Sequence, residues 1–255
     1  MTDEKKRDAV ARPSTTARPR PDHAPPATSG ASAIDAFVAK ASALGPASAS
    51  GARRGRLVFA LDATMSRQPT WDLACSLQAQ MFETTAQIGG LAVQLVYFRG
   101  FSECRASRWV VDPAALTAMM VKIDCRGGHT QIGRVLSHVR NEARGEGVDA
   151  FVLVGDAFEE DIDAVCAKAG ELGLLNAKGF FFQEGGEPNA ERAFREMARL
   201  TGGAYARFDA GAPGALAGLL RAAATYASAG ANGLERLAAH EPQAQALLTA
   251  MRRKG

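Results

Sequence analysis

An unbroken apolar run that ends in an aspartate limits the folds open to this chain. Leu57 to Leu61 is apolar throughout, and Asp62, Thr64 and Ser66 follow at alternate positions. Such a run is typical of a central parallel strand that is buried on both faces. In open α/β sheets, ligands bind beyond the carboxyl ends of the strands. The sequence therefore predicts a polar site directly after this strand.

Strands and helices are expected to alternate along the rest of the chain. Further strand-like runs stand at 91–98, 101–111, 149–156, 177–183 and 205–208. Segments with helical spacing of apolar residues lie at 71–88, 113–123, 131–144, 159–172, 190–200 and 216–229. The runs at 91–98 and 101–111 are close enough to form a hairpin. This order predicts an α/β fold with a mostly parallel sheet and helices on both faces.

Composition divides the chain into four segments. Residues 1–31 are rich in Pro, Ala and basic residues and lack aromatic residues, so we expect a disordered tail. Residues 32–55 are expected to form a short helix, with Ser32 as its N-cap, and a linker. Residues 56–230 should form the folded domain. Residues 231–255 have a helical pattern that is interrupted near Pro242, and we expect a C-terminal helical extension.

Charge and cysteine usage exclude several functional classes. Residues 1–56 hold ten of the 30 Lys and Arg residues but only five of the 27 Asp and Glu residues, so the folded domain has no basic excess and no nucleic-acid partner is expected. No apolar run is long enough to span a membrane. The four cysteines have no metal-ligand spacing, and we expect free, mostly buried thiols in a reducing compartment. The sequence therefore predicts a cytoplasmic protein.

Three loops at the predicted carboxyl edge of the sheet carry oxygen ligands. They are Asp62-Ala63-Thr64-Met65-Ser66, Gly128-His129-Thr130 and Gly155-Asp156. Carboxylate and hydroxyl oxygens are the ligands that a hard cation such as Mg²⁺ requires.

With these loops the chain resembles the von Willebrand factor type A (VWA) family, whose metal-ion-dependent adhesion site has the pattern Asp-x-Ser-x-Ser, a distant Thr and a more distant Asp. Asp62, Thr64 and Ser66 match the first element with Thr in place of the first Ser, and Thr130 and Asp156 match the others. The stretch 197–205 is similar to the last helix-to-strand passage of the family. The chain looks like a bacterial, cytoplasmic member.

The resemblance implies a Rossmann-like, three-layer αβα fold with a mostly parallel six-stranded sheet and one antiparallel edge strand. It also implies a metal site formed by Asp62, Thr64, Ser66, Thr130 and Asp156, holding Mg²⁺, or Mn²⁺ or Ca²⁺. The expected activity is protein binding without catalysis. A partner protein offers an Asp or Glu side chain to the metal.

Residues next to these ligands have simpler roles that we also expect. His129 is predicted to be solvated or to donate a hydrogen bond to a ligand, and Thr130 occupies the position of a helix N-cap. Glu159, Glu160 and Asp161 are predicted to lie in the first turn of a helix, where acidic side chains interact favourably with the helix dipole.

Two other functions remain open. Gly155-Asp156 followed by Asp161 resembles the haloacid dehalogenase-like phosphohydrolases, but their first motif needs a second Asp as general acid where this chain has Thr64. The other alternative is a VWA-fold scaffold with a vestigial metal site. The sequence indicates neither the partner and its pathway nor the oligomeric state.

Overall fold

The computed structural model describes residues 53–209 and 211–253, and its central feature is one six-stranded sheet with the strand order β3-β2-β1-β4-β5-β6. The strands are β1 (Gly55–Asp62), β2 (Leu91–Arg99), β3 (Glu103–Ala106), β4 (Ala150–Gly155), β5 (Lys178–Glu184) and β6 (Ala204–Phe208). All neighbouring strands are parallel except β2 and β3. This confirms the predicted α/β class and the antiparallel edge strand.

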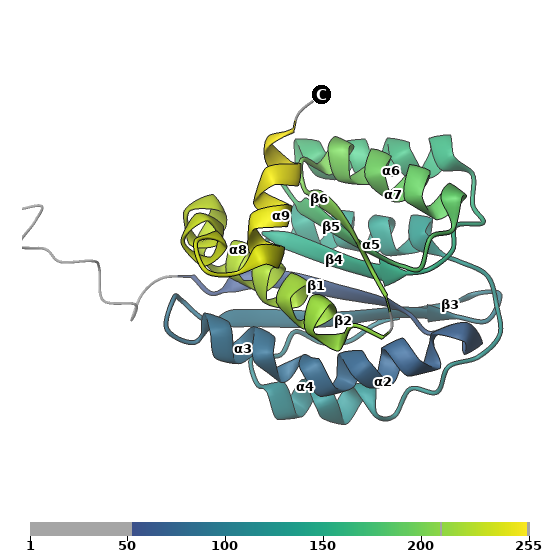
Figure 1. The fold of residues 1–255 in the computed structure, drawn as a ribbon. Helices are drawn as coiled ribbons and strands as arrows, with labels where there is room; N and C mark the ends of the chain where they lie inside the picture. Colours follow the sequence, from purple (N-terminus) through teal and green to yellow (C-terminus); the bar gives the residue numbers. More distant parts are fainter. Residues whose placement is uncertain (1–52, 210, 254–255) are drawn as a thin grey trace, which may run out of the picture. The chain divides into compact units, whose positions relative to one another are not determined.

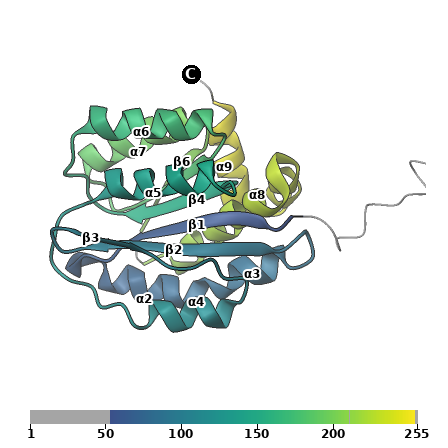
Figure 2. The same ribbon diagram turned by 180° about the vertical axis from the view of Figure 1, so that it is seen from behind.

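Helices cover both faces of the sheet (Figure 1, Figure 2). The side chains of Leu57, Phe59 and Leu61 point to one face, where they pack in a core with α2 (Gln68–Leu77), α3 (Ala79–Thr85), α4 (Pro113–Met120), α8 (Pro213–Ala238) and α9 (Pro242–Arg252). Those of Val58 and Ala60 point to the other, with α5 (Ile132–Arg144), α6 (Ile162–Leu174) and α7 (Pro188–Thr201). Burial on both faces explains why β1 is apolar without alternation.

The strand register determines which residues meet at the carboxyl edge of the sheet. Leu61 pairs with Val154 of β4, so the ends of β1 and β4 lie at the same level. Asp62 pairs with Phe98 of β2 on the other side. Asp62 and Asp156 therefore leave the sheet next to each other.

Two predicted elements differ from the structure. The helix predicted over 71–88 is divided into α2 and α3 at Gln78, where Met81 N–H bonds to Gln78 O, one residue nearer than in an α-helix. The strand predicted over 101–111 pairs only over β3, because the Ser107 hydroxyl accepts the Leu95 N–H at 3.0 Å and interrupts the ladder. Val110 then makes an isolated bridge to Val93.

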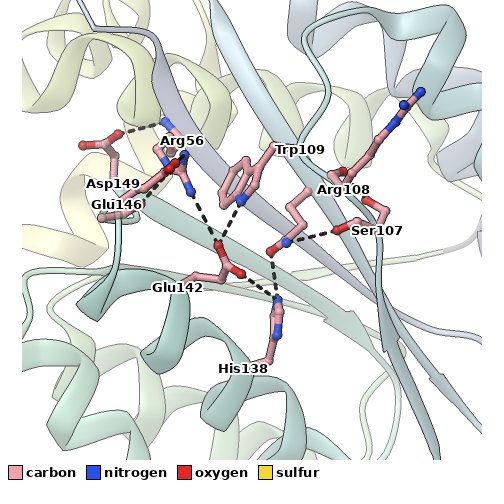
Figure 3. A network of polar contacts seen from close by, with 10 residues as sticks. Arg56, Ser107, Arg108, Trp109, His138, Glu142, Glu146 and Asp149 are labelled. Atoms are coloured by element: carbon pink, nitrogen blue, oxygen red, sulfur yellow. Dashed lines mark hydrogen bonds and ion pairs between the residues drawn. The ribbon is translucent and has the colours of Figure 1, made fainter.

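A polar network surrounds the amino end of β1 (Figure 3). Arg56 donates from its backbone N–H to Asp149 at 2.8 Å and from Nε to Gly147 O at 2.8 Å, and it forms ion pairs with Glu146 and Glu142. The Arg56 guanidinium lies over the Trp109 ring, with 3.9 Å between its Cζ atom and the ring centroid. The network ties the start of β1 to the start of β4 and to the end of α5.

The ends of the chain were predicted separately from the domain. The tail at 1–31, the helix capped by Ser32 and most of the 32–55 linker lie outside the described residues. The C-terminal segment contains helices: α8 changes direction at Gly230, and α9 packs against α8 and β6 through buried residues that include Leu247 and Leu248. No helix in the ranges 53–209 and 211–253 combines the length and apolar character of a membrane span.

The four cysteines are free, as predicted, but the expectation that most of them are buried is wrong. Only Cys125 is buried, while Cys75, Cys104 and Cys166 are partly exposed. Their positions on helices and strands next to the surface account for this difference.

Candidate metal centre

The five predicted ligand residues lie around one cavity at the carboxyl edge of the sheet. The cavity has a volume of about 270 Å³, and its lining includes Asp62, Thr64, Ser66, Thr130 and Asp156. Gly128 also lines it, at a point where the backbone of Gly100 approaches so closely that an added Cβ would lie 2.1 Å from the Gly100 carbonyl oxygen. The structure thus places together residues that three separate loops contribute.

The first loop turns immediately after β1. Thr64 has an extended backbone, and its N–H donates to Asp62 Oδ1 at 2.8 Å. A short 3-10 helix, η1 (Met65–Arg67), then brings Ser66 back toward the strand end. The Ser66 hydroxyl lies 3.4 Å from Thr64 Oγ1 and 3.4 Å from Asp156 Oδ2. Three of the predicted ligands are therefore connected through Ser66.

Thr130 is buried but is not the N-cap of α5. The N-cap position belongs to Gln131, which makes no capping hydrogen bond through its side chain. The Thr130 hydroxyl instead accepts the Glu159 N–H at 3.1 Å. The predicted capping role of Thr130 is wrong, because its hydroxyl joins this loop to the loop that follows β4.

The acidic residues after Asp156 also differ from the prediction that all three lie in the first turn of a helix. Asp161 is the N-cap of α6 and accepts the Ala164 N–H at 2.7 Å. Glu159 accepts the Thr130 N–H at 3.1 Å and lies 3.1 Å from His129 Nδ1. Glu160 accepts N–H groups at the start of α5, those of Ile132 and Gly133. Glu159 and Glu160 therefore stabilise the amino end of the neighbouring helix and its loop.

Burial dominates the electrostatics of Asp62. Loss of hydration raises the pKa of this carboxyl from 3.8 to about 6, although the Thr64 N–H lowers it. The nearby charge of Asp156 raises the pKa further, and the charge of Arg67 lowers it. The folded chain therefore holds an ionised Asp62 at a free-energy cost, which a bound cation would offset.

Sequence reasoning missed Arg67. Arg67 is 2% exposed. Its guanidinium lies 3.5 Å from Asp156 Oδ2 and forms an ion pair with Glu184. Thr70 also donates a hydrogen bond from its hydroxyl to Glu184. The position of Arg67 next to Ser66 was the available signal, but its partner Glu184 comes from the end of β5, far along the chain.

The donor set fits a hard divalent cation. The carboxylates of Asp62 and Asp156 balance a double positive charge, and three hydroxyl groups add neutral oxygen donors. Within residues 53–209 and 211–253, no three His, Cys, Asp or Glu side chains form a metal-binding group. The candidate centre is thus a mixed carboxylate and hydroxyl site of the kind that the five residues predict.

The phosphohydrolase alternative requires a different arrangement. Asp161, which matched the second acidic position of that family, bonds to the backbone of α6 and is absent from the cavity lining. The residue two positions after Asp62 is Thr64, whose hydroxyl is a poor general acid at neutral pH. The observed roles of both residues argue against this alternative.

Comparison with known proteins adds an independent view of the fold. No family model and no curated protein matches the sequence. Among solved structures, a von Willebrand factor type A protein from Catenulispora acidiphila superposes with a TM-score of 0.56 and 17% identity, over 68% of this chain and 42% of that one. The fold is that of a VWA domain.

Two other structures share this VWA fold. The SpRpn10 VWA domain has a TM-score of 0.50 and 10% identity, over 62% of this chain and 89% of that domain. The pilus adhesin SpaC from Lactobacillus rhamnosus GG has a TM-score of 0.53 and 10% identity, over 69% of this chain and 30% of the adhesin. This chain therefore spans less than half of the Catenulispora protein and of SpaC, and the likeness concerns the fold.

Proposed function

We propose that this VWA-fold chain is a protein-binding domain that depends on a divalent metal and does not catalyse a reaction. Mg²⁺, or Mn²⁺ or Ca²⁺, would be held by Asp62, Thr64, Ser66, Thr130 and Asp156. The observation that carries the proposal is the meeting of these five oxygen-bearing side chains around one cavity. The metal would bind an Asp or Glu side chain of a partner protein.

The chemistry of the site supports weak, reversible metal binding. Asp62 and Asp156 are the only carboxylates among the five residues, so few charges hold the ion, and we expect a dissociation constant of roughly 10⁻⁴–10⁻³ M. A bound ion would supply a positive charge that attracts an incoming carboxylate. The three hydroxyl donors are neutral, so they add no negative charge beyond that of the two carboxylates, and an anionic partner group meets no further repulsion from the ligands.

The surface beside the cavity supports a protein partner. Met65, which lines the cavity, is 65% exposed, and Phe101 is 80% exposed. The Phe101 ring contacts the His129 ring edge-on, with 5.2 Å between the centroids, and His129 N–H bonds to Gly100 O. These two exposed apolar side chains offer contact area to a protein that binds at the polar site.

The cellular setting is part of the proposal. Free cysteines with partly exposed positions fit a reducing compartment, and we propose a cytoplasmic, bacterial-type adaptor or scaffold. The SpRpn10 VWA domain and the SpaC pilus adhesin have the same fold at 10% identity to this chain. The fold alone therefore does not indicate the partner.

The proposal is tested by titrating the full chain with Mg²⁺ and with Mn²⁺. We expect saturable heat in calorimetry and chemical-shift changes near Asp62 in the wild type, and neither in Asp62→Ala. Asp163→Ala is the matched control, because Asp163 is an exposed carboxylate on α6 away from the cavity lining. A wild type without heat and without shift changes contradicts the proposal.

Partner capture is tested separately from metal binding. Proteins that co-purify with the tagged wild type from its native cell extract should be released by EDTA and should be absent with Asp62→Ala. Capture that ignores EDTA contradicts metal dependence, even if the titration shows metal binding.

One observation favours the second candidate function, a scaffold with a vestigial metal site. The Arg67 guanidinium already provides a positive charge 3.5 Å from Asp156. In this alternative the arginine replaces the metal, and neither Mg²⁺ nor Mn²⁺ binds to the wild type.

A further inference from the structure

Two buried charges occur at the same place in the molecule. Among the described residues, Asp62 and Arg67 are the only charged residues in the buried class, at 4% and 2% exposure. Burying a charge costs free energy unless other charges and hydrogen bonds compensate for the lost water. A buried arginine beside a candidate cation site is therefore unexpected, because both the arginine and a bound cation are positively charged.

Local structure fixes the position of Arg67. The Arg67 N–H bonds to Thr64 O at 2.9 Å, which closes η1 and directs the side chain toward the ends of neighbouring strands. The guanidinium then lies between Asp156, which follows β4, and Glu184, at the end of β5. The Thr70 hydroxyl holds the same Glu184 oxygen that pairs with Arg67.

Asp156 is shared between Arg67 and the candidate metal centre. Its Oδ2 atom lies 3.5 Å from Arg67 Nη1 and 3.4 Å from the Ser66 hydroxyl. A cation that binds Asp156 among the five donors must therefore approach a fixed positive charge. Because Arg67 is buried, little water screens its charge, and it repels a second positive charge nearby.

We propose that Arg67 is an internal cation that shares Asp156 with the metal ion and lowers the metal affinity of the centre. The inference rests on the proposed function, because it concerns the same site. The positive charge of Arg67 compensates the negative charge of Asp156 when the metal is absent. Glu184 keeps Arg67 in place when the metal binds, since it provides a second carboxylate on the far side of the guanidinium.

A purely structural role for Arg67 makes a different prediction. If the arginine served only to connect η1 with β5, its removal would lower stability and leave the affinity of a still-folded protein for metal unchanged. If Arg67 held Asp156 in the orientation that the metal needs, its removal would weaken metal binding. Only a competing charge predicts tighter binding after its removal.

The test compares metal dissociation constants of variant and wild-type full-length chains, measured by calorimetry with Mg²⁺ and Mn²⁺. Arg67→Met removes the charge and keeps an apolar side chain of similar length. Because it leaves Glu184 partly buried without its arginine, Arg67→Met/Glu184→Gln serves as a second variant that removes both charges. A cooperative unfolding transition, measured in EDTA, shows that each variant is folded.

A matched pair elsewhere controls for the change in charge. Arg221 donates to both carboxylate oxygens of Glu241, at 3.2 and 3.0 Å, on α8 and in the connection to α9. Neither residue lines the candidate centre. Arg221→Met and Arg221→Met/Glu241→Gln make the same changes of charge and should leave the metal dissociation constant within about threefold of wild type.

We expect Arg67→Met to bind the metal roughly tenfold or more tightly than wild type, and the double variant to change in the same direction by a smaller factor. Arg67→Lys keeps the positive charge beside Asp156, and its metal dissociation constant should stay within about threefold of wild type. Folded Arg67 variants with unchanged or weaker metal affinity overturn the inference and leave the proposed function standing. If the wild type shows no binding while Arg67→Met binds, the inference holds and the proposed function of the wild type fails. If no protein in the series binds either metal, both fail.

Discussion

The charged residues at the two ends of β1 have opposite surroundings. At the amino end, Arg56 has four polar partners and a stacked indole ring, and Glu142 accepts a hydrogen bond from Trp109 Nε1 at 2.9 Å (Figure 3). At the carboxyl end, burial raises the pKa of Asp62 to about 6, and the Ser66 hydroxyl stands at 3.4 Å from each neighbouring oxygen. The Arg56 charge therefore has several polar partners, whereas the buried Asp62 carboxyl, which accepts the Thr64 N–H at 2.8 Å, carries a charge that burial penalises.

We therefore expect the two ends of β1 to differ in their effects on the free energy of unfolding and on metal binding. Charges with many short hydrogen bonds gain most from the folded state, so the amino end should contribute to the free energy of unfolding. A buried carboxylate with few partners reduces that free energy and gains only when a cation arrives. We infer that the amino end of β1 holds the sheet together, and that the carboxyl end is organised to receive an ion.

The largest expected effect lies at the amino end. Arg56→Met removes the cation that pairs with Glu142 and Glu146 and the Nε donor to Gly147 O, and we expect the free energy of unfolding to fall by about 2–4 kcal/mol. Metal affinity should stay unchanged, because Arg56 lies at the opposite end of the strand. Denaturant unfolding and metal calorimetry on the same protein samples check both parts.

Arg195→Met is the matched control for Arg56→Met. Arg195 also pairs with a glutamate, Glu191, and stacks on an aromatic ring, with its Cζ atom 4.2 Å from the Tyr205 centroid, but its side chain is 60% exposed. Exposed pairs contribute at most about 1 kcal/mol. Equal losses from the two variants would contradict the special role of the amino end.

The second largest expected effect is the pH dependence of the metal affinity. A carboxylate must lose its proton to bind a cation, and Asp62 has a pKa of about 6. Below this pH, the dissociation constant for Mg²⁺ should rise about tenfold for each pH unit. Calorimetry between pH values of about 5 and 8 measures this slope, and an affinity that is flat across this range would exclude Asp62 as a ligand.

The raised pKa of Asp62 changes the free energy of unfolding in EDTA in the opposite direction: a rise in pH strengthens metal binding but lowers stability. The unfolded chain has the lower pKa, so the folded chain binds more protons between pH 3.8 and about 6. The contribution of Asp62 to the free energy of unfolding therefore falls as pH rises through this window, and the penalty is fully present above it.

The smallest effect on stability is expected at Thr130. Thr130→Ala removes the acceptor of the Glu159 N–H, and we expect a loss of about 1 kcal/mol or less in the free energy of unfolding. The variant should stay folded and lose metal-dependent partner capture, while Thr130→Ser should retain most of it. A Thr130→Ala protein that captures the same partners in an EDTA-sensitive way would remove Thr130 from the site.

The sequence predicted the features that follow from local patterns. The apolar run before Asp62 and the order of strands and helices were sufficient for an α/β fold with a mostly parallel sheet, because burial on both faces leaves a pattern that can be read along the chain. The VWA fold followed from the resemblance of the motifs at Asp62, Thr130 and Asp156 to that family. The positions of Asp62, Thr130 and Asp156 at one edge followed from parallel strands ending at the same level. Their role as metal ligands remains a prediction.

Other features depend on contacts between distant residues. Arg67 and Glu184 are paired only because β5 ends beside the loop after β1, and nothing near either residue signals its partner. The hydroxyl of Thr130 bonds to the loop after β4 instead of capping its own helix, for the same reason. Local propensity predicts neither contact, since both arise from the packing of separate βα units.

The comparison between the ends of β1 is tested most directly by two matched substitutions, Asp62→Asn at the carboxyl end and Asp149→Asn at the amino end. Each removes one negative charge and keeps a side-chain acceptor. The free energy of unfolding is measured at about pH 8, in EDTA and again in millimolar Mg²⁺. In EDTA, Asp149→Asn should be less stable than wild type, because Asp149 accepts the Arg56 N–H and pairs with Arg53.

Asp62→Asn should be more stable than wild type in EDTA by about 1–3 kcal/mol, since a pKa raised from 3.8 to about 6 marks a penalty that the amide does not carry. Mg²⁺ should then stabilise the wild type and Asp149→Asn but leave Asp62→Asn unchanged. An Asp62→Asn protein that is less stable than wild type in EDTA, or that responds to Mg²⁺ as the wild type does, would contradict the account.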